Sequence, residues 1–156
     1  MEFLHSTFYI IALISSLTMA GLYGVFHNTI MPTLAQLPPV TAAAVMQRIN
    51  RTIQNPLFLM VFLLSCMSGP LLVIFTYLNQ QVVSWHQILA AVLMFSSVLS
   101  TIKKNVPLNN QLDQTPLTPA DINGVWKSYL IHWNPWNAYR FYACLLAGIL
   151  LSLNLI

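Results

Sequence analysis

Arg140 is the residue of this sequence with the clearest potential for chemistry, because it is a cation inside a largely apolar run. It follows Asn137 by three residues, and an α-helix places residues at that spacing on one face. A charge within a membrane is costly unless it is paired or lines a cavity. We therefore interpret Arg140 and Asn137 as candidate catalytic groups that stabilise an anion. The alternative is that the long Arg140 side chain extends to the lipid headgroups.

Asparagines form a second group of candidate functional residues, because several of them fall near one predicted membrane boundary. An amide both donates and accepts hydrogen bonds, so converging amides can bind a carbonyl, a phenol or a developing oxyanion. We interpret Asn109 as a further catalytic candidate, and Asn50, Asn55 and Asn105 as substrate-binding candidates. The alternative is that these residues cap helices and shape turns, as expected for Asn55 directly before a proline.

Histidines provide the candidate bases. His27 and His132 are predicted near the same membrane boundary, and an imidazole can act as a general base because it titrates near neutral pH. The alternative is a polar histidine that faces the headgroups. With two histidines in each half of the membrane and no carboxylate within it, we expect no metal site. The sequence also has no glycine-rich phosphate loop and no dinucleotide-binding motif, so we expect no cofactor.

The composition is that of an integral membrane protein. Hydrophobic residues make up 57% of the chain and charged residues only 6%, against about 25% charged in soluble domains. The mean hydropathy is +0.69. Lysine and arginine do not cluster on one face, so no nucleic-acid partner is expected. Cys66 and Cys144 stand singly in apolar runs, which argues against a thiol redox enzyme.

The apolar runs predict an all-α fold, namely an integral membrane four-helix bundle that forms a single transmembrane domain over residues 1–156. A run of about 20 apolar residues crosses a hydrocarbon core of about 30 Å. The expected spans cover residues 8–28, 57–78, 82–102 and 137–154. A secretory signal peptide is the rival interpretation of the first span, but that run is too long and lacks a preceding lysine or arginine. Pro70 predicts a kink in the second span.

Short amphipathic helices at the membrane interface are predicted in the first and third loops. Pro32, Pro38 and Pro39 are expected to end the first helix, and Pro39 fits the first turn of the next, where apolar residues follow at helical spacing. Lys103 and Lys104 are expected to end the third span. Another amphipathic helix is expected to begin after a Thr118 cap and to end at the pair of residues 134–135, Asn-Pro.

The distribution of cations predicts the orientation in the membrane. Loops one and three hold Arg48, Arg51, Lys103, Lys104 and Lys127, whereas the termini and the second loop hold no lysine or arginine. By the positive-inside rule, loops one and three face the cytoplasm and both termini face outward. Tryptophans 133 and 136 then fall at the cytoplasmic interface, where indole rings are common.

Several stretches of the chain together resemble a known family. In chain order they read LAQLPP, MQRINRTIQNP and NVPLNNQL, followed by a tryptophan-rich ending that contains Trp126, Trp133, Trp136, Asn137 and Arg140. In this combination the chain resembles the anthrone-oxygenase-like family. Its members are small four-helix integral membrane proteins, most of them with no known function.

The resemblance implies a reaction. Some fungal members are associated with the oxidation of an anthrone to an anthraquinone by molecular oxygen, without a metal or flavin. Such a reaction needs a base, an anion-stabilising group and a dry pocket. The resemblance assigns anion stabilisation to Arg140 and the asparagines, stacking on a flat polycycle to Trp133 and Trp136, and proton removal to His27 or His132. Members often carry histidine directly after the Trp-Asn pair. Ala138 stands there in this chain, which argues against a proton-transfer role at that position.

Two hypotheses follow for the function. The first is a membrane protein that binds a flat or amphipathic hydrophobic small molecule near the cytoplasmic face and acts as a cofactor-independent oxygenase. The second is a non-catalytic module that binds membrane lipid or serves as an accessory subunit. Small residues on the first predicted helix also make a homo-oligomer a reasonable expectation.

Overall fold

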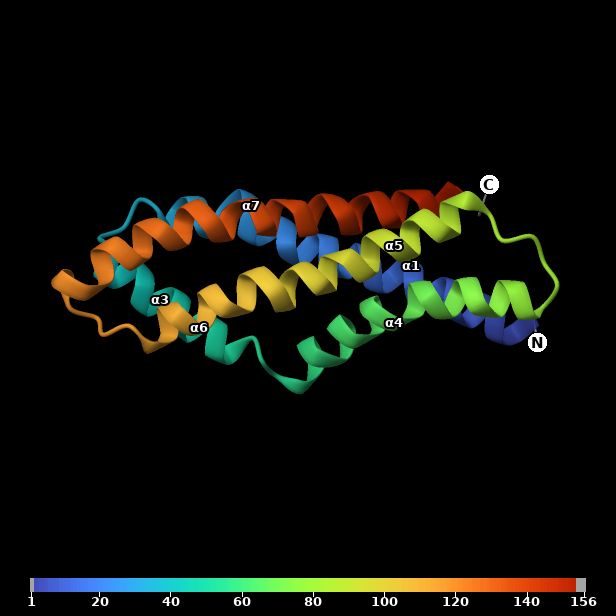
Figure 1. Cartoon of the computed structure of the whole chain (residues 1–156), viewed down its shortest axis with the longest axis horizontal. Helices are drawn as coiled ribbons and strands as arrows, with labels where there is room; N and C mark the ends of the chain where they lie inside the picture. Colours follow the sequence, from blue (N-terminus) through green and yellow to red (C-terminus); the bar gives the residue numbers. More distant parts are fainter. Residues whose placement is uncertain (1, 154–156) are drawn as a thin grey trace.

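The computed structural model describes residues 2–153, and this part of the chain forms helices without strands (Figure 1). Four long helices lie side by side. Helix α1 contacts α4 and α7, and helix α5 contacts the same two partners. The predicted all-α class and the bundle of membrane helices are confirmed. The four helices are α1 (Glu2–Val25), α4 (Pro56–Leu78), α5 (Trp85–Ser100) and α7 (Pro119–Ser152).

Membrane-spanning character is clear in three stretches of helix. Phe3–Leu34, Pro56–Leu78 and Trp85–Gln114 are each long and apolar enough to cross a bilayer. Large apolar side chains such as Ile14 and Leu63 are more than half exposed, as expected for surfaces that face lipid tails rather than water. Helix α7 is not among these three stretches, because its C-terminal part also holds polar residues such as Asn137 and Arg140. The span at residues 137–154 therefore stays a prediction.

The first helix is longer than its prolines predict. Helix α1 continues through a π-helical turn, η1 (Phe26–Ile30), into α2 (Met31–Leu34). The helix therefore passes Pro32, the first of the three prolines that were predicted to end it, and ends at Leu34, before Pro38 and Pro39. In the π-helical turn the backbone amide of Met31 donates to the carbonyl of Phe26, five residues earlier. The hydrogen-bond pattern of the helix has therefore already changed before Pro32, which has no N–H group to donate.

The third helix also continues beyond its predicted end. Helix α5 runs through a second π-helical turn, η2 (Thr101–Asn105), into α6 (Val106–Gln114). The prediction that Lys103 and Lys104 end this helix is wrong. Both lysines are exposed, so their charges do not require the helix to stop. The helix begins at Trp85 because Ser84 and Gln87 form a reciprocal capping box.

Helix α7 is a single helix that joins the polar third loop to the bundle. Thr118 caps it by accepting a hydrogen bond from the amide of Asp121, as predicted. The prediction that Asn134 and Pro135 end this helix is wrong, because α7 continues to Ser152. Pro135 lies on the exposed side of the helix. Proline has no N–H group, so one backbone hydrogen bond of α7 is not made there, and packing of the buried side of α7 offsets this loss.

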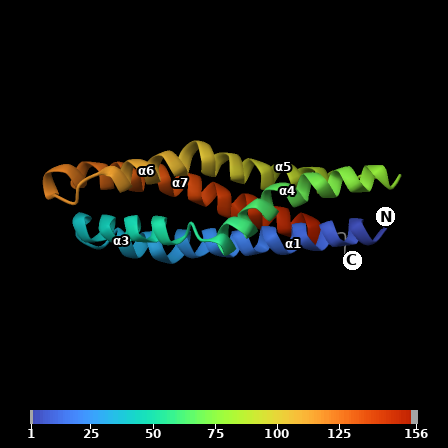
Figure 2. The same cartoon turned by 90° about the horizontal axis from the view of Figure 1, so that it is seen from below.

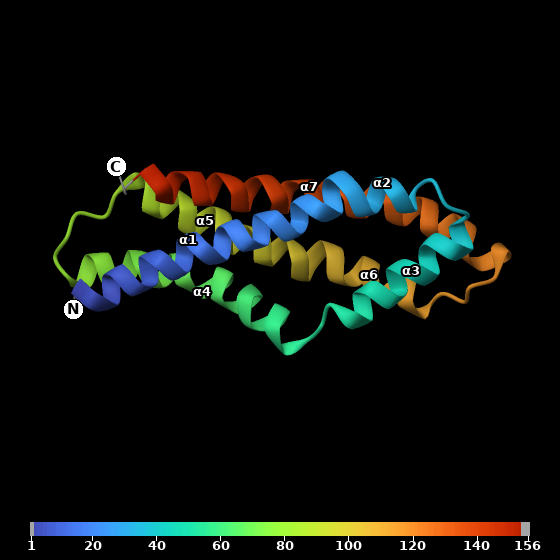
Figure 3. The ribbon, with the colours of Figure 1, turned by 180° about the vertical axis from the view of Figure 1, so that it is seen from behind.

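Helix α4 packs tightly against the bundle only in its C-terminal half. No residue of α4 before Ser65 is buried, whereas Gly69 and Leu72 are. A Cβ atom at Gly69 would lie 2.9 Å from the Cα atom of Ala91, so glycine allows α4 and α5 to approach closely there. Figures 1 and 3 show the N-terminal half of α4 diverging from α5. Pro70 lies inside this helix, where a bend was predicted.

The loop helices form a second packing unit at one end of the bundle. Helix α3 (Pro39–Thr52) contacts α6 and α7, and apolar side chains from all three share one buried cluster. Figures 1 and 2 show these helices at the end of the molecule opposite to the start of α1. The short helices predicted in the first and third loops are therefore present. They close the bundle at the end where the candidate functional residues gather.

Candidate functional site

A cavity of about 300 Å³ lies where the loop helices meet the bundle. Helices α1, α3, α4, α6 and α7 contribute to its walls, together with the two π-helical turns. Such turns often occur at functional sites because they change the direction in which side chains point. The lining combines aromatic and aliphatic side chains with amides and a single cation: Leu22, Tyr23, Phe26, Met46, Asn50, Ile53, Gln54, Phe58, Leu59, Phe62, Thr101, Ile102, Val106, Asn109, Asn110, Trp133, Asn137 and Arg140.

Arg140 lies at the cavity wall and is only 5% exposed. Its Nη1 donates to Thr101 Oγ1 over 3.2 Å, and its Nη2 donates to Asn137 Oδ1 over 3.1 Å. The guanidinium carbon lies 4.4 Å from the ring centroid of Tyr23 and 5.3 Å from that of Trp133. Aromatic faces attract a cation at these distances. Arg140 is therefore held in the interior and does not extend to the headgroups.

No carboxylate neutralises Arg140 in the part of the chain that the structure describes. The ion pair found there joins Arg51 to Asp113 at 2.7 Å, and both of those side chains are substantially exposed. The Nε atom of Arg140 is buried and has no hydrogen-bond partner. The cavity thus contains a positive charge that is held by neutral oxygens and aromatic rings.

Asn137 holds Arg140 in place. Its Oδ1 accepts from Arg140, and its Nδ2 donates to the backbone carbonyl of Tyr23 over 3.0 Å. One side chain thereby ties α7 to α1 and orients the guanidinium. Because its Oδ1 holds Arg140 and one Nδ2 hydrogen holds the Tyr23 carbonyl, Asn137 is a positioning residue in this structure.

Asn109 is oriented by two aromatic side chains of α7. Its Oδ1 accepts from the hydroxyl of Tyr129 over 2.7 Å and from Nε1 of Trp133 over 2.8 Å. Burial raises the pKa of the Tyr129 phenol, so this group stays protonated and continues to donate. With its oxygen occupied in this way, Asn109 has its Nδ2 group free to donate at the cavity wall.

Two further buried groups at the cavity make no hydrogen bond of normal geometry. They are Nδ2 of Asn50, which faces the Tyr129 hydroxyl, and the hydroxyl of Tyr23, which faces Arg140 and Thr101. Both residues are at most 6% exposed, and an unpaired buried polar group costs about 1–3 kcal/mol.

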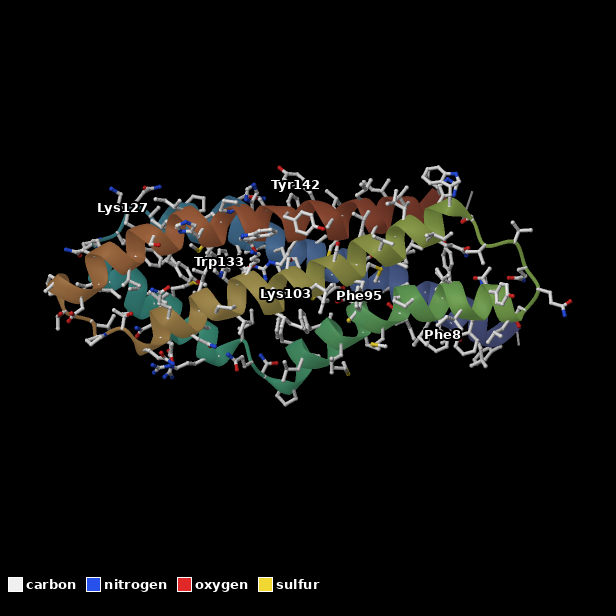
Figure 4. All side chains as sticks on the ribbon, in the orientation of Figure 1. Phe8, Phe95, Lys103, Lys127, Trp133 and Tyr142 are labelled. Atoms are coloured by element: carbon white, nitrogen blue, oxygen red, sulfur yellow. The ribbon has the colours of Figure 1, made fainter. Side chains whose placement is uncertain are left out.

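The structure brings five of the predicted site residues to this one cavity: Arg140, Asn137, Asn109, Asn50 and Trp133. Figure 4 shows Trp133 pointing inward from α7, whereas Tyr142 farther along the same helix points away.

Other predicted amides serve the fold. Asn105 is buried behind the cavity, where its Nδ2 donates to the carbonyl of Trp133 over 3.3 Å. Asn55 caps α4 by accepting from the amide of Phe58 over 3.0 Å. The capping alternative is therefore the one that the structure shows for Asn55.

The remaining predicted residues lie away from the cavity lining. His27 packs against the rings of Phe141 and Tyr142, and His132 is exposed and bonded to the carbonyl of Ser128. Trp136 is exposed beneath the ammonium group of Lys104, which lies 5.2 Å from its ring centroid. The structure does not bring either of these imidazoles, or Trp136, to the cavity.

Sequence reasoning missed Tyr23, Thr101 and Tyr129 as site residues. Tyr23 and Thr101 lie in apolar runs that were interpreted only as spans, and Tyr129 lies in the helix after Thr118 that was interpreted only as amphipathic. A hydroxyl in each of these apolar settings was the available signal, because a buried hydroxyl usually needs a partner.

Comparison with known proteins identifies the family. Neither a search of curated proteins nor a search of solved structures finds a match. The family model described as anthrone oxygenase matches residues 44–150, well over half of the chain. The matched segment includes α4, α5 and α6 and most of α3 and α7, and therefore Asn50, Asn109, Asn137 and Arg140. The chain belongs to the anthrone oxygenase family.

Proposed function

We propose that this protein binds a flat hydrophobic small molecule in the cavity at Arg140 and oxidises it as an anthrone-type oxygenase. The observation that carries the proposal is the buried, unneutralised Arg140 between aromatic side chains in a cavity. A pocket that combines apolar walls with a few placed polar groups is typical of small-molecule sites. Membership of the anthrone oxygenase family supports the choice of reaction.

The walls of the cavity favour a planar ligand. Tyr23, Phe26, Phe58 and Trp133 all contribute rings to the lining. Aromatic faces pack on a flat polycycle in stacked or edge-to-face arrangements. The polar groups lie on α1, α3, α6 and α7, so a ring system within the cavity would have its oxygen substituents within reach of donors.

The proposed reaction converts a ring methylene group beside the carbonyl system into a second carbonyl. Loss of one proton leaves an enolate, whose negative charge rests on the existing oxygen near Arg140. The carbanion carbon then transfers electrons to O₂ and forms a carbon–oxygen bond, which gives a peroxide anion. This anion takes up a proton from water, in place of the one lost in the first step, and becomes a hydroperoxide. Loss of water from this hydroperoxide yields the new carbonyl. One oxygen atom of O₂ remains in the product and the other leaves in water. Arg140 and Asn109 stabilise the enolate anion through which the reaction proceeds.

Access from the membrane also supports a hydrophobic ligand. Phe58, Leu59 and Phe62 line the cavity from the N-terminal half of α4. No residue of α4 before Ser65 is buried, and this part of the helix diverges from α5 (Figure 3). A compound dissolved in the bilayer would meet the cavity through this weakly packed wall.

Oxygen uptake tests the proposal. Protein purified in mild detergent should consume O₂ when anthrone is added, above the rate without protein, and form anthraquinone in equal amount. Arg140→Ala should lose this activity, whereas Arg48→Ala should keep it, because Arg48 is an exposed arginine of α3. Equal turnover by the Arg140 variant would refute the role of this residue. Absence of turnover, with only bulk phospholipid retained by both variants, would favour the non-catalytic lipid-binding or accessory module.

We also propose that the loop helices face the cytoplasm. The exposed Arg48 lies on α3, and Figure 4 shows Lys127 at the same end of the molecule. The exposed Lys103 and Lys104 lie on η2, between that end and the middle of the molecule. Single cysteines at Gln80 and Gln114 in a cysteine-free background test this orientation. An impermeant thiol reagent applied to intact cells should label position 80, and it should label position 114 only after the membrane is opened. The reverse pattern would refute the orientation.

A further inference from the structure

We propose that the cavity takes up its ligand as a preformed oxyanion, so that it selects acidic planar aromatic compounds that have already lost a proton to water. This inference rests on the ligand-binding part of the proposed function and is independent of the oxygenase step. It changes the role expected of the protein. The chain supplies a binding site for the conjugate base and does not supply the group that removes the proton.

Hydrogen-bond donors from four helices converge on the cavity. Arg140 Nε and Asn50 Nδ2 are buried and make no hydrogen bond of normal geometry, although Asn50 faces the Tyr129 hydroxyl. The buried Tyr23 hydroxyl faces Arg140 and Thr101, and Asn109 is oriented with its Nδ2 free. These groups come from α7, α3, α1 and α6. An oxygen that carries negative charge accepts several hydrogen bonds at once, and such charge-assisted bonds are about twice as strong as neutral ones. The donor set therefore suits an oxyanion better than a neutral carbonyl.

The charge around Arg140 points to the same class of ligand. The titratable groups that face it are Tyr23 from α1 and Tyr129 and Cys144 from α7. Phenols and thiols are neutral in their ordinary protonated form near pH 7. The exposed Lys103 and Lys104 of η2, the exposed Arg48 of α3 and the Arg51–Asp113 pair between α3 and α6 supply no unpaired negative charge. An anionic ligand would therefore neutralise a buried cation that lacks a counter-ion within residues 2–153.

The cavity lining offers no general base in the usual sense. Among its residues only Tyr23 and Arg140 are titratable, and neither imidazole predicted as a base lies there. A ligand whose proton has passed to water before it enters needs no such base. The ligand O–H or enolisable C–H bond breaks in water, and the proton stays in the solvent. The electron pair remains on the ligand oxygen that Arg140 contacts.

The measurement is the acidity of a bound aromatic phenol. We would titrate 2-naphthol with protein in detergent and follow its phenolate absorption band with pH, using protein-free micelles as the reference. An opposite charge at contact distance lowers a pKa by about 1–3 units. The pKa of the bound naphthol should therefore fall by about one unit or more. Arg140→Lys should retain part of this shift, and Arg140→Gln should remove it while naphthol still binds.

Matched competitors make the test independent of any variant. Anthracene-9-carboxylate should displace naphthol at about tenfold lower concentration than the neutral anthracene-9-methanol, because one pKa unit corresponds to a factor of ten. Equal displacement by the two, or bound naphthol with an unshifted pKa, would overturn the inference and leave the pocket standing. Equal potency of oleate would overturn the assignment to planar aromatics in favour of a fatty-acid anion. If no probe binds, both the inference and the proposed ligand site fail.

Discussion

The Oδ1 atom of Asn137 accepts a hydrogen bond from Nη2 of Arg140 over 3.1 Å, across one turn of α7. The same amide donates to the backbone carbonyl of Tyr23 on α1. One side chain therefore contributes both to the orientation of the buried guanidinium, which Thr101 also binds, and to the contact between α7 and α1. A substitution of Asn137 should therefore affect both the stability of the fold and the orientation of Arg140.

Replacement of Asn137 by alanine should lower the free energy of unfolding by about 1–3 kcal/mol, because it leaves a buried guanidinium nitrogen and a buried carbonyl unpaired. Asn123→Ala is the matched control, since Asn123 is an exposed asparagine on the same helix. Its effect should stay within about 0.5 kcal/mol. Thermal unfolding in detergent measures both, and equal stability of the two variants would show that the Asn137 hydrogen bonds contribute little.

Loss of the Tyr129 hydroxyl should weaken ligand binding without unfolding the protein. In Tyr129→Phe, Asn109 keeps only its bond from Trp133. The affinity for an aromatic oxyanion should fall by about twofold to tenfold, in line with about 0.5–1.5 kcal/mol for one hydrogen bond. Tyr142→Phe, on the exposed side of α7, should have no effect.

Combination of Tyr129→Phe with Trp133→Phe should cost more than the sum of the two single changes. Either donor alone holds the Asn109 oxygen, whereas loss of both frees the amide to rotate. A double-mutant cycle on the affinity for anthracene-9-carboxylate measures this coupling. Additive effects would show that the two aromatic residues do not act through Asn109.

Gly69→Ala should destabilise the protein by about 1–3 kcal/mol through overpacking. Its Cβ atom would lie 2.9 Å from the Cα atom of Ala91, so a backbone must move to accommodate it. Gly21→Ala is the control, because a Cβ atom there meets nothing within 4 Å. That change should be neutral or stabilise the helix by up to about 1 kcal/mol. Thermal unfolding should rank the variants in this order, and the opposite order would refute the close packing of α4 on α5.

The two polar connections between α3 and α6 should differ in strength. Gln47 is buried and its Nε2 donates to the carbonyls of Leu112 and Thr115 over 2.8 Å and 3.2 Å. Gln47→Leu should cost about 1–3 kcal/mol, since it leaves buried acceptors unpaired.

The second connection is the exposed Arg51–Asp113 pair. Arg51→Ala should cost less than about 1 kcal/mol, and this smaller cost should shrink further in high salt, which screens exposed charges. Unfolding at low and high salt compares Arg51→Ala with Gln47→Leu. A larger, salt-sensitive loss from Arg51→Ala would contradict the ranking.

The fold class was determined by the sequence because it depends on length and hydropathy. A bilayer imposes runs of about 20 apolar residues with internally bonded backbone, so the helices can be located without knowledge of their packing. The helix ends could not be located from the sequence in this way. Pro32, Pro135 and the pair of lysines at 103 and 104 all predict termination, yet the helices continue through them. Local propensity costs a few kcal/mol at such positions, and packing of the flanking turns outweighs it.

The candidate site was likewise determined partly by the sequence and partly by the tertiary structure. The type and position of Arg140, Asn137 and the other asparagines identified a polar layer at one membrane boundary, because charge and amide groups in apolar surroundings are conspicuous in a sequence. Only the tertiary structure decided which amides meet. It assigned Asn55 to a helix cap and Asn109 to the cavity, and it brought Tyr23 to Arg140. Contacts between helices distant in sequence depend on crossing and rotation of whole helices, which no local pattern encodes.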